Sequence, residues 1–242
     1  MTAYSFHDVG AYSSSLTGGN MTPAMPAFNA GELLVLETGV NSVSLGSPTV
    51  TGYTRVSPNS NAPCSSLYLR IAQAGDMSPS VQWDASHQAY ARITSFGGDV
   101  YTDLGTIVAV SSDRGTNASG ALAVQSTAVP SLANCMVIRG GHCLKTATNN
   151  GSSFNDWTND SGIYTKIGNT QLVQSGTAVA AALWYWQQTT ATATSSDIAN
   201  LTNSDTSANT QGFTIVLKTA TTAIFVPSRP LSQGAIGVQM CQ

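Results

Sequence analysis

Short apolar runs recur along the whole chain, separated by polar stretches rich in Gly, Pro, Asn and Ser. The runs contain many β-branched and aromatic residues, and runs of about 4 to 8 such residues between turn formers are typical of β-strands. We therefore predict strands at 31–40, 52–56, 65–73, 90–96, 104–110, 133–140, 162–168, 181–188, 212–218 and 223–226.

Helical signals are nearly absent from the sequence. No apolar stripe with a period of about 3.6 residues persists for long enough to predict a regular helix. The exception is the segment 196–205, where Ser196 is suited to cap one short helical turn. The pattern as a whole predicts an all-β protein of about eight to ten antiparallel strands.

The two halves of the chain present similar apolar runs in the same order. The matched segments are 33–36 with 135–138, 53–56 with 164–167, 67–69 with 183–185, and Ile93 with Ile215. A single sheet needs another layer to cover its apolar face. We therefore predict that two similar four-stranded halves interleave face to face in a jelly-roll-like β-sandwich with one shared interior.

These matches also suggest boundaries. We expect an N-terminal arm at 1–27, and a sandwich at 28–218 whose halves, 28–98 and 126–218, are joined by a linker at 99–125. A C-terminal strand or arm at 219–242 completes the chain.

The segment "AALWYWQQTT", residues 181–190, concentrates aromatic residues in a chain rich in small polar ones. Side chains alternate along a strand, so Leu183 and Tyr185 are expected to face the interior while Trp184 and Trp186 point away from it. Loops or a neighbouring subunit would then cover these tryptophans, because large exposed apolar patches are uncommon on monomers. Alternatively they form a platform on which a carbohydrate stacks, a role also open to Trp157.

Composition narrows the classes of partner. Only 9% of the residues are charged, the net charge is −3, and the nine Lys and Arg are scattered. A nucleic-acid partner is not expected, because no basic patch is present. Neither a membrane-spanning run nor a secretory signal is recognisable, so we expect synthesis and folding in a cytoplasm.

The four cysteines, Cys64, Cys135, Cys143 and Cys241, show no paired spacing typical of a zinc site. We expect mostly buried or partly buried thiols. The alternatives are a bridge from Cys135 to Cys143 or a bridge between subunits, formed outside the reducing compartment.

Catalytic and metal-binding motifs give little support for an enzyme. The chain contains neither an HExxH motif nor a GxSxG elbow. His142 and Cys143 are adjacent, but consecutive strand residues point to opposite faces. Asp156 and Asp160 offer oxygen ligands for calcium, yet Asx residues in loops usually bond to their own backbone. We predict no enzymatic activity, no cofactor and no metal site.

A family resemblance follows from a series of motifs. "AGELLVLETG", "GYTRV", "LYLRIAQAGD" and "VQWDASHQAYARITSFGG", with the later "VPSLANCMVIRGG", resemble a pattern of tailed-bacteriophage structural proteins over residues 20 to 220. The chain departs from it at Tyr53, where a tryptophan is common. The resemblance implies a jelly-roll-like sandwich on the outside of a virion, as a head decoration or cement protein or as a tail or fibre component.

Both ends of the chain carry apolar residues, although free tails are normally polar. Tyr4 and Phe6 lie near the N-terminus, and Phe225 lies in the C-terminal segment. We expect these arms to pack, either across their own sandwich or onto an adjacent subunit.

The functional expectation is a non-enzymatic virion protein that stabilises neighbouring coat or tail subunits, assembled in the cytoplasm of a bacterial host. Few charges and many hydroxyls and amides suit large contacts that are insensitive to salt. Its partners would be other virion proteins and further copies of itself. The alternatives are a tail or fibre adhesin that binds a host glycan, and a β-sandwich hydrolase.

Overall fold

The computed structural model describes residues 5–15, 17, 19–40, 46–57, 65–83, 87–98, 107–117, 121–124, 135–146, 157–159, 165–174, 177–190, 197–201 and 208–218. These residues contain only strands, turns and bends, so the all-β prediction is confirmed for them.

The strands of the first half are β1 (Ser5–Val9), β2 (Ser13–Ser15), β3 (Gly19–Met21), β4 (Leu33–Val40), β5 (Thr54–Ser57), β6 (Ser65–Ile71), β7 (Val81–Trp83) and β8 (Ala89–Gly97). Those of the second half are β9 (Ile107–Asn117), β10 (Ala121–Val124), β11 (Cys135–Thr146), β12 (Trp157–Asn159), β13 (Thr165–Gln174), β14 (Thr177–Gln188), β15 (Asp197–Leu201) and β16 (Ala208–Lys218).

The predicted strands from 31–40 to 212–218 each overlap an observed strand, whereas 223–226 lies outside the described residues. The predicted helical turn at 196–205 is wrong, because residues 197–201 form β15. This strand pairs with β10 and β12 along its length, and such tertiary pairing overrides a local capping signal. The interval 99–125 holds β9 and β10.

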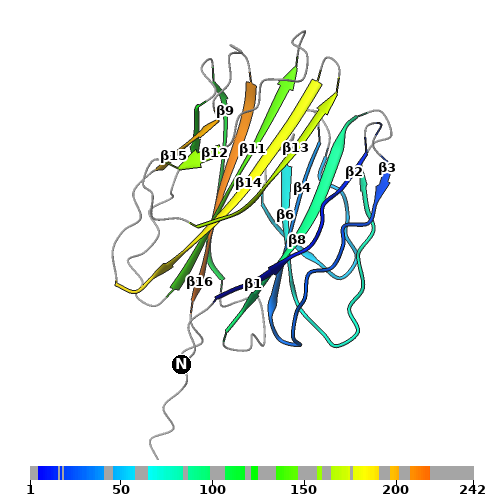
Figure 1. The fold of residues 1–242 in the computed structure, drawn as a ribbon, viewed down its shortest axis with the longest axis vertical. Coiled ribbons are helices and arrows are strands. Elements are labelled where there is room, and N and C mark those ends of the chain that lie inside the picture. The colour runs from blue at the N-terminus through cyan, green and yellow to red at the C-terminus, as the bar shows by residue number, and fades with distance from the viewer. Residues whose placement is uncertain are drawn as a thin grey trace, which may run out of the picture.

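Two large antiparallel sheets form the centre of the molecule (Figure 1). Sheet I has the order β1-β8-β4-β6-β5, with β2 also paired to β8, and comes entirely from the first half of the chain. Sheet II has the order β13-β14-β11-β16-β9 and comes entirely from the second half. The ladders of the described strands therefore do not interleave the two halves, unlike the crossing of strands between sheets that we expected.

The two sheets have the same topology. Each strand in the five-strand order of sheet I has a counterpart in sheet II at the same place in chain order: β1 with β9, β4 with β11, β5 with β13, β6 with β14 and β8 with β16. With this correspondence, neighbouring strands in one sheet are also neighbours in the other. The registers agree as well. Following the ladders across each sheet, the equivalent pairs are Thr54 and Thr165, Leu69 and Tyr185, Val35 and Ile138, Thr94 and Ile215, and Val9 and Val110.

This register corrects two of the matches made from sequence. The pairing of 53–56 with 164–167 and of 67–69 with 183–185 agrees with the ladders. By contrast, Leu33 corresponds to Met136 rather than Cys135, and Ile93 to Thr214 rather than Ile215. Because side chains alternate along a strand, an error of one residue in such a match exchanges the side chains that face the interior with those that face away from it.

Smaller strands lie on the outer side of each large sheet, and Figure 1 shows β12 and β15 on one side of the molecule and β3 on the other. β3 pairs with β7 outside sheet I, and β10 pairs with β15 outside sheet II. These segments occupy the same places in the chain order of the two halves. The fold is therefore a four-layer arrangement in which the second half repeats the first.

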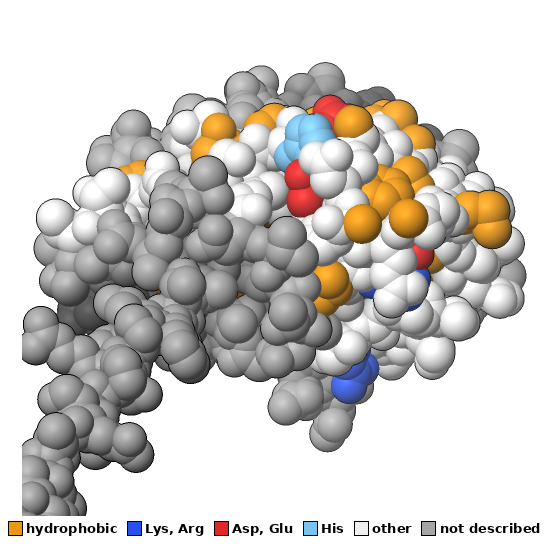
Figure 2. Space-filling view, turned by 90° about the horizontal axis from the view of Figure 1, so that it is seen from below, with side chains coloured by type: hydrophobic (Ala, Val, Ile, Leu, Met, Phe, Trp, Pro, Cys, Tyr) orange, Lys and Arg blue, Asp and Glu red, His pale blue; other side chains and the backbone are white. Residues whose placement is uncertain are grey.

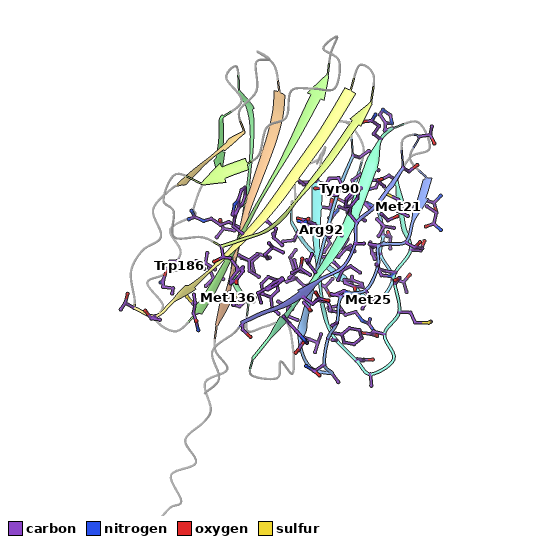
Figure 3. All side chains as sticks on the ribbon, in the orientation of Figure 1. Met21, Met25, Tyr90, Arg92, Met136 and Trp186 are labelled. Carbon is purple, nitrogen blue, oxygen red and sulfur yellow. The ribbon has the colours of Figure 1, made fainter. Side chains whose placement is uncertain are left out.

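One apolar cluster, here called the inter-sheet core, joins sheets I and II. It consists of Leu33, Val35, Leu67, Leu69, Phe96, Met136, Ile138, Leu183, Ile215 and Leu217, all at most 1% exposed. Both halves contribute to it, as predicted. A second cluster fills the space between sheet I and its outer segments, where Met21 and Met25 lie (Figure 3). The strand β4 is consequently buried on both faces.

Candidate functional site

The aromatic segment of β14 alternates as expected. Leu183 belongs to the inter-sheet core and Tyr185 packs against it. Trp184 lies on the opposite face, but it is only 3% exposed within this single chain. This low exposure agrees with the alternative that loops of the chain itself cover Trp184, and a contact with a partner or a glycan stays a prediction.

Trp186 is half-buried and lies on the side of sheet II that faces away from sheet I (Figure 3). A role for Trp186 in contacts stays a prediction. Trp157 is the first residue of β12, and its side chain lies outside the described residues. Tyr4 and Phe225 lie outside them entirely.

Phe6 is partly buried and packs against the inter-sheet core. Its ring stacks on Tyr185 with the centroids 5.6 Å apart and meets the edge of Phe96 at 6.3 Å. The strand β1 that carries it pairs with β8. For residues 5–9, the first of our two alternatives is thus correct, because this part of the N-terminal arm packs across its own sandwich.

Two hydrogen-bonded groups hold the N-terminal segment in place. Asp8 Oδ2 accepts a bond from the backbone N–H of Ala27 at 2.6 Å, which holds the pKa of Asp8 below its ordinary value. His7 Nδ1 lies 2.7 Å from Glu32 Oε2, and Asn29 donates to Oε1 of the same carboxylate. Burial acts to raise the pKa of Glu32, but these bonds outweigh it and hold that pKa below 4.5.

Cys135 and Cys143, the two cysteines considered for a disulfide, lie far apart on one strand. Cys135 is a buried thiol, and its burial raises its pKa. Cys143 lies eight positions further along the same strand, β11, which is about 26 Å at the rise of a strand and far beyond the reach of a disulfide. His142 and Cys143 both lie within β11, and their side chains lie outside the described residues.

Glu37 and Arg92 form a buried ion pair. Their side chains are 3% and 5% exposed, and Glu37 Oε1 lies 2.7 Å from Arg92 Nε and 2.5 Å from Nη2. Both residues follow the alternation that directs Val35 and Phe96 inward, so the pair lies between the two large sheets, in line with the position of Arg92 in Figure 3. The pair stabilises one arrangement of the sheets rather than exposing charge to solvent.

A hollow that the sequence did not reveal lies over the edge of sheet I at β5. Its volume is about 300 Å³, and it is lined by Ser47, Pro48, Thr49, Val50, Tyr53, Arg55 and Tyr68. Arg55 and Tyr68 are paired across the β5–β6 ladder and therefore share a face. The sequence signal available was the motif "GYTRV", which placed a tyrosine and an arginine two residues apart on a strand.

Several hydrogen bonds fix the walls of this hollow. The Tyr68 hydroxyl donates to the carbonyl of Pro48, and Ser66 Oγ donates to Ser47 Oγ at 2.7 Å. The N–H of Tyr53 bonds to the carbonyl of Val50 at 3.2 Å. Burial raises the pKa of Tyr68 to about 12, so its hydroxyl remains a proton donor at neutral pH.

Arg70 clamps the turn beside the hollow. Its guanidinium donates to both carboxylate oxygens of Asp76 and, at 2.9 Å, to the carbonyl of Gly52. It also lies 5.9 Å from the centre of the Tyr53 ring. Gly52 has a φ of +80°, and a Cβ there would come within 2.3 Å of Arg70 Nη1, so only glycine allows this approach.

The described part of the chain contains neither a cluster of side chains suited to a metal ion nor a membrane-spanning helix. Its residues include no group of three or more His, Cys, Asp or Glu side chains positioned to hold a metal ion. Asp156 and Asp160, the calcium candidates, lie outside those residues. In the same described segments, no helix is long and apolar enough to cross a membrane.

Comparisons with protein-family models, curated proteins and solved structures found no match to this chain.

Proposed function

We propose that this protein is a structural, non-enzymatic component of the exterior of a tailed-bacteriophage particle. In this role it acts as a decoration or cement protein that stabilises neighbouring coat subunits. Its partners are other virion proteins and further copies of itself. The proposal includes the jelly-roll-like sandwich expected from the sequence. In support of it, the two large sheets share the inter-sheet core.

One observation carries the proposal. Each carboxylate whose side chain is described, those of Asp8, Glu32, Glu37 and Asp76, is bonded within the chain itself. These described carboxylates are therefore used for contacts within the chain. Figure 2 accordingly shows a face on which neutral and apolar side chains outnumber charged ones among the described residues. Such a surface favours broad contacts that depend little on ionic strength.

The test uses purified particles with and without the protein. We expect particles that lack it to lose genome at lower temperature or after milder osmotic shock, and added protein to restore their resistance. Because the contacts are largely neutral, binding should be similar at about 50 mM and about 500 mM salt. Particles that keep full strength but adsorb poorly to cells would contradict the proposal and support the adhesin.

A glycan-binding role has one specific observation in its favour, the hollow at β5. A binding site of this kind does not depend on where in the particle the protein is assembled.

A further inference from the structure

The hollow at β5 brings together polar groups that the fold itself does not use. Arg55 is exposed, and the described part of the chain offers it no carboxylate partner. The Tyr53 hydroxyl is buried without a hydrogen-bond partner. Leaving a buried polar group unpaired destabilises a protein, so unused groups of this kind are candidates for a ligand.

The lining combines three kinds of surface. Pro48, Val50 and the ring of Tyr68 are apolar, Ser47 and Thr49 carry hydroxyls, and Arg55 carries a positive charge. A sugar ring matches this combination, since its C–H faces are apolar and its edges carry hydroxyls. A guanidinium adds specificity for a carboxylate, which it binds through two parallel hydrogen bonds.

The hollow is also formed before any ligand arrives. The bonds from Tyr68 to Pro48, from Ser66 to Ser47 and from Arg70 to Gly52 fix the segment 47–53 on the face of sheet I. A preformed site costs a ligand less ordering entropy than a flexible one.

The volume of the hollow and its single positive charge argue against a peptide and against a phosphate group as the ligand. A volume of about 300 Å³ is at the lower limit for small-molecule sites, which suits one sugar ring rather than a peptide. A phosphate group would favour several cationic or N–H donors, whereas Arg55 is the single cation in the lining.

We propose that the hollow formed by residues 47–50, Tyr53, Arg55 and Tyr68 binds one carboxylate-bearing sugar residue, such as a uronic acid at the end of a surface polysaccharide. The inference goes beyond the structural role and does not depend on it. It also moves the glycan-binding candidate from the tryptophans of β14 to the edge of sheet I.

The experiment titrates the full chain with glucuronic acid, glucose or acetate and follows the ring signals of selectively labelled tyrosines by NMR. We expect glucuronic acid to shift the signals of Tyr53 and Tyr68, with a Kd on the order of 1 mM. Tyr12, which is 46% exposed and does not line the hollow, should not respond. Glucose should bind at least about tenfold more weakly, and acetate should not compete at equal concentration.

Two variants separate this site from a general effect of charge. Arg55→Gln should weaken glucuronic acid binding about tenfold or more and leave glucose binding unchanged. Lys145→Gln, on β11 in the other half, removes the same charge and should bind like the wild type. Because Arg55 is exposed, its substitution should leave the thermal unfolding midpoint nearly unchanged.

Three results would overturn the proposal. These are no response of Tyr53 and Tyr68 to glucuronic acid, equal losses in Arg55→Gln and Lys145→Gln, and full competition by acetate, which would indicate a simple anion site. None of them bears on particle stability, so a failure here is distinct from a failure of the structural role.

Discussion

At the scale of single residues, the charged side chains of this protein hold segments of the chain together. Glu37 and Arg92 join β4 to β8 between the two large sheets, and Arg70 and Asp76 fix the turn beside the hollow. The two pairs differ in burial, since the first is almost fully enclosed and the second is partly open to solvent. Their removal should therefore have different consequences.

Glu37→Gln leaves the Arg92 guanidinium buried without a counter-charge. We expect the free energy of unfolding, measured by urea denaturation, to fall by about 3–5 kcal/mol. The double variant Glu37→Leu with Arg92→Met replaces the pair by apolar groups and should recover most of that loss. If Glu37→Gln were as stable as the wild type, the charge of Glu37 would not contribute to the free energy of unfolding.

Asp76→Asn tests the partly exposed pair and its dependence on pH. Hydrogen bonds from Arg70 hold the pKa of Asp76 below its ordinary value of 3.8. The stability that this pair contributes is therefore fully present above that value, and it is lost as the pH falls through the lower pKa of the folded state.

At pH 7 the variant should lose about 1–2 kcal/mol in urea denaturation. At pH values below 3.8 the difference between the variant and the wild type should shrink. A difference that stays constant as the pH falls would exclude a contribution from the ionised carboxylate.

At the scale of elements, the four strands at the ends of the two five-strand orders, β1, β5, β9 and β13, each carry an extra residue. The ladders shift register between Phe6 and Asp8 in β1, between Arg55 and Ser57 in β5, and between Lys166 and Gly168 in β13; in β9, the shift lies opposite Val216 and Leu217. The inner ladders of both sheets run without a shift. Bulges at edges discourage the addition of further strands, so contacts with partners are expected on faces and loops.

The N-terminal segment depends on a close approach at Gly10. Its N–H bonds to the carbonyl of Ile93 at 2.9 Å, and a Cβ at this position would lie 2.0 Å from the carbonyl oxygen of Ala24. Gly10→Ala should therefore displace residues 5–27, expose them to limited proteolysis and cost about 1–3 kcal/mol of stability. Gly46→Ala is the control, because a Cβ at Gly46 would meet nothing within 4 Å.

Cleavage of the Gly10→Ala variant at the same rate as the wild type would show that this approach does not secure the segment. Faster cleavage of both glycine variants would show that the effect does not depend on the contact with Ala24.

The sequence predicted the long strands and their order but not the register of two of them. β4 is buried on both faces, so Leu33, Leu34, Val35 and Leu36 are all apolar and show no alternation. A strand of this kind carries no signal of which face points inward. The low exposure of Trp184 was one of the alternatives that the sequence left open, because the pattern of a single strand does not show what covers its outer face.

No sequence motif predicted the hollow at β5 either. "GYTRV" suggested a turn and a strand, but the cavity also needs Pro48 and Tyr68, which are brought together only by the β5–β6 ladder and the bond between them. Sites assembled from separate segments by tertiary contacts leave no local spacing to recognise.

At the scale of the whole molecule, the two halves of the chain share the inter-sheet core. Each half builds its own five-stranded path, and each contributes side chains to the inter-sheet core, with Leu69 and Ile138 on opposite sheets. Because neither sheet can cover this face alone, the halves should lose their structure together. A rigid unit of this kind is what the proposed structural role requires.

Hydrogen exchange of the Leu69→Ala variant, followed by mass spectrometry, tests this claim most directly. Leu69 is fully buried in sheet I, and its truncation should cost about 2–5 kcal/mol. If the interior is shared, amide protection in β11 and β14 of sheet II should fall by the same factor as in β4 and β8 of sheet I. Unchanged protection in β11 and β14, with sheet I alone destabilised, would show two separately cored lobes and contradict the account.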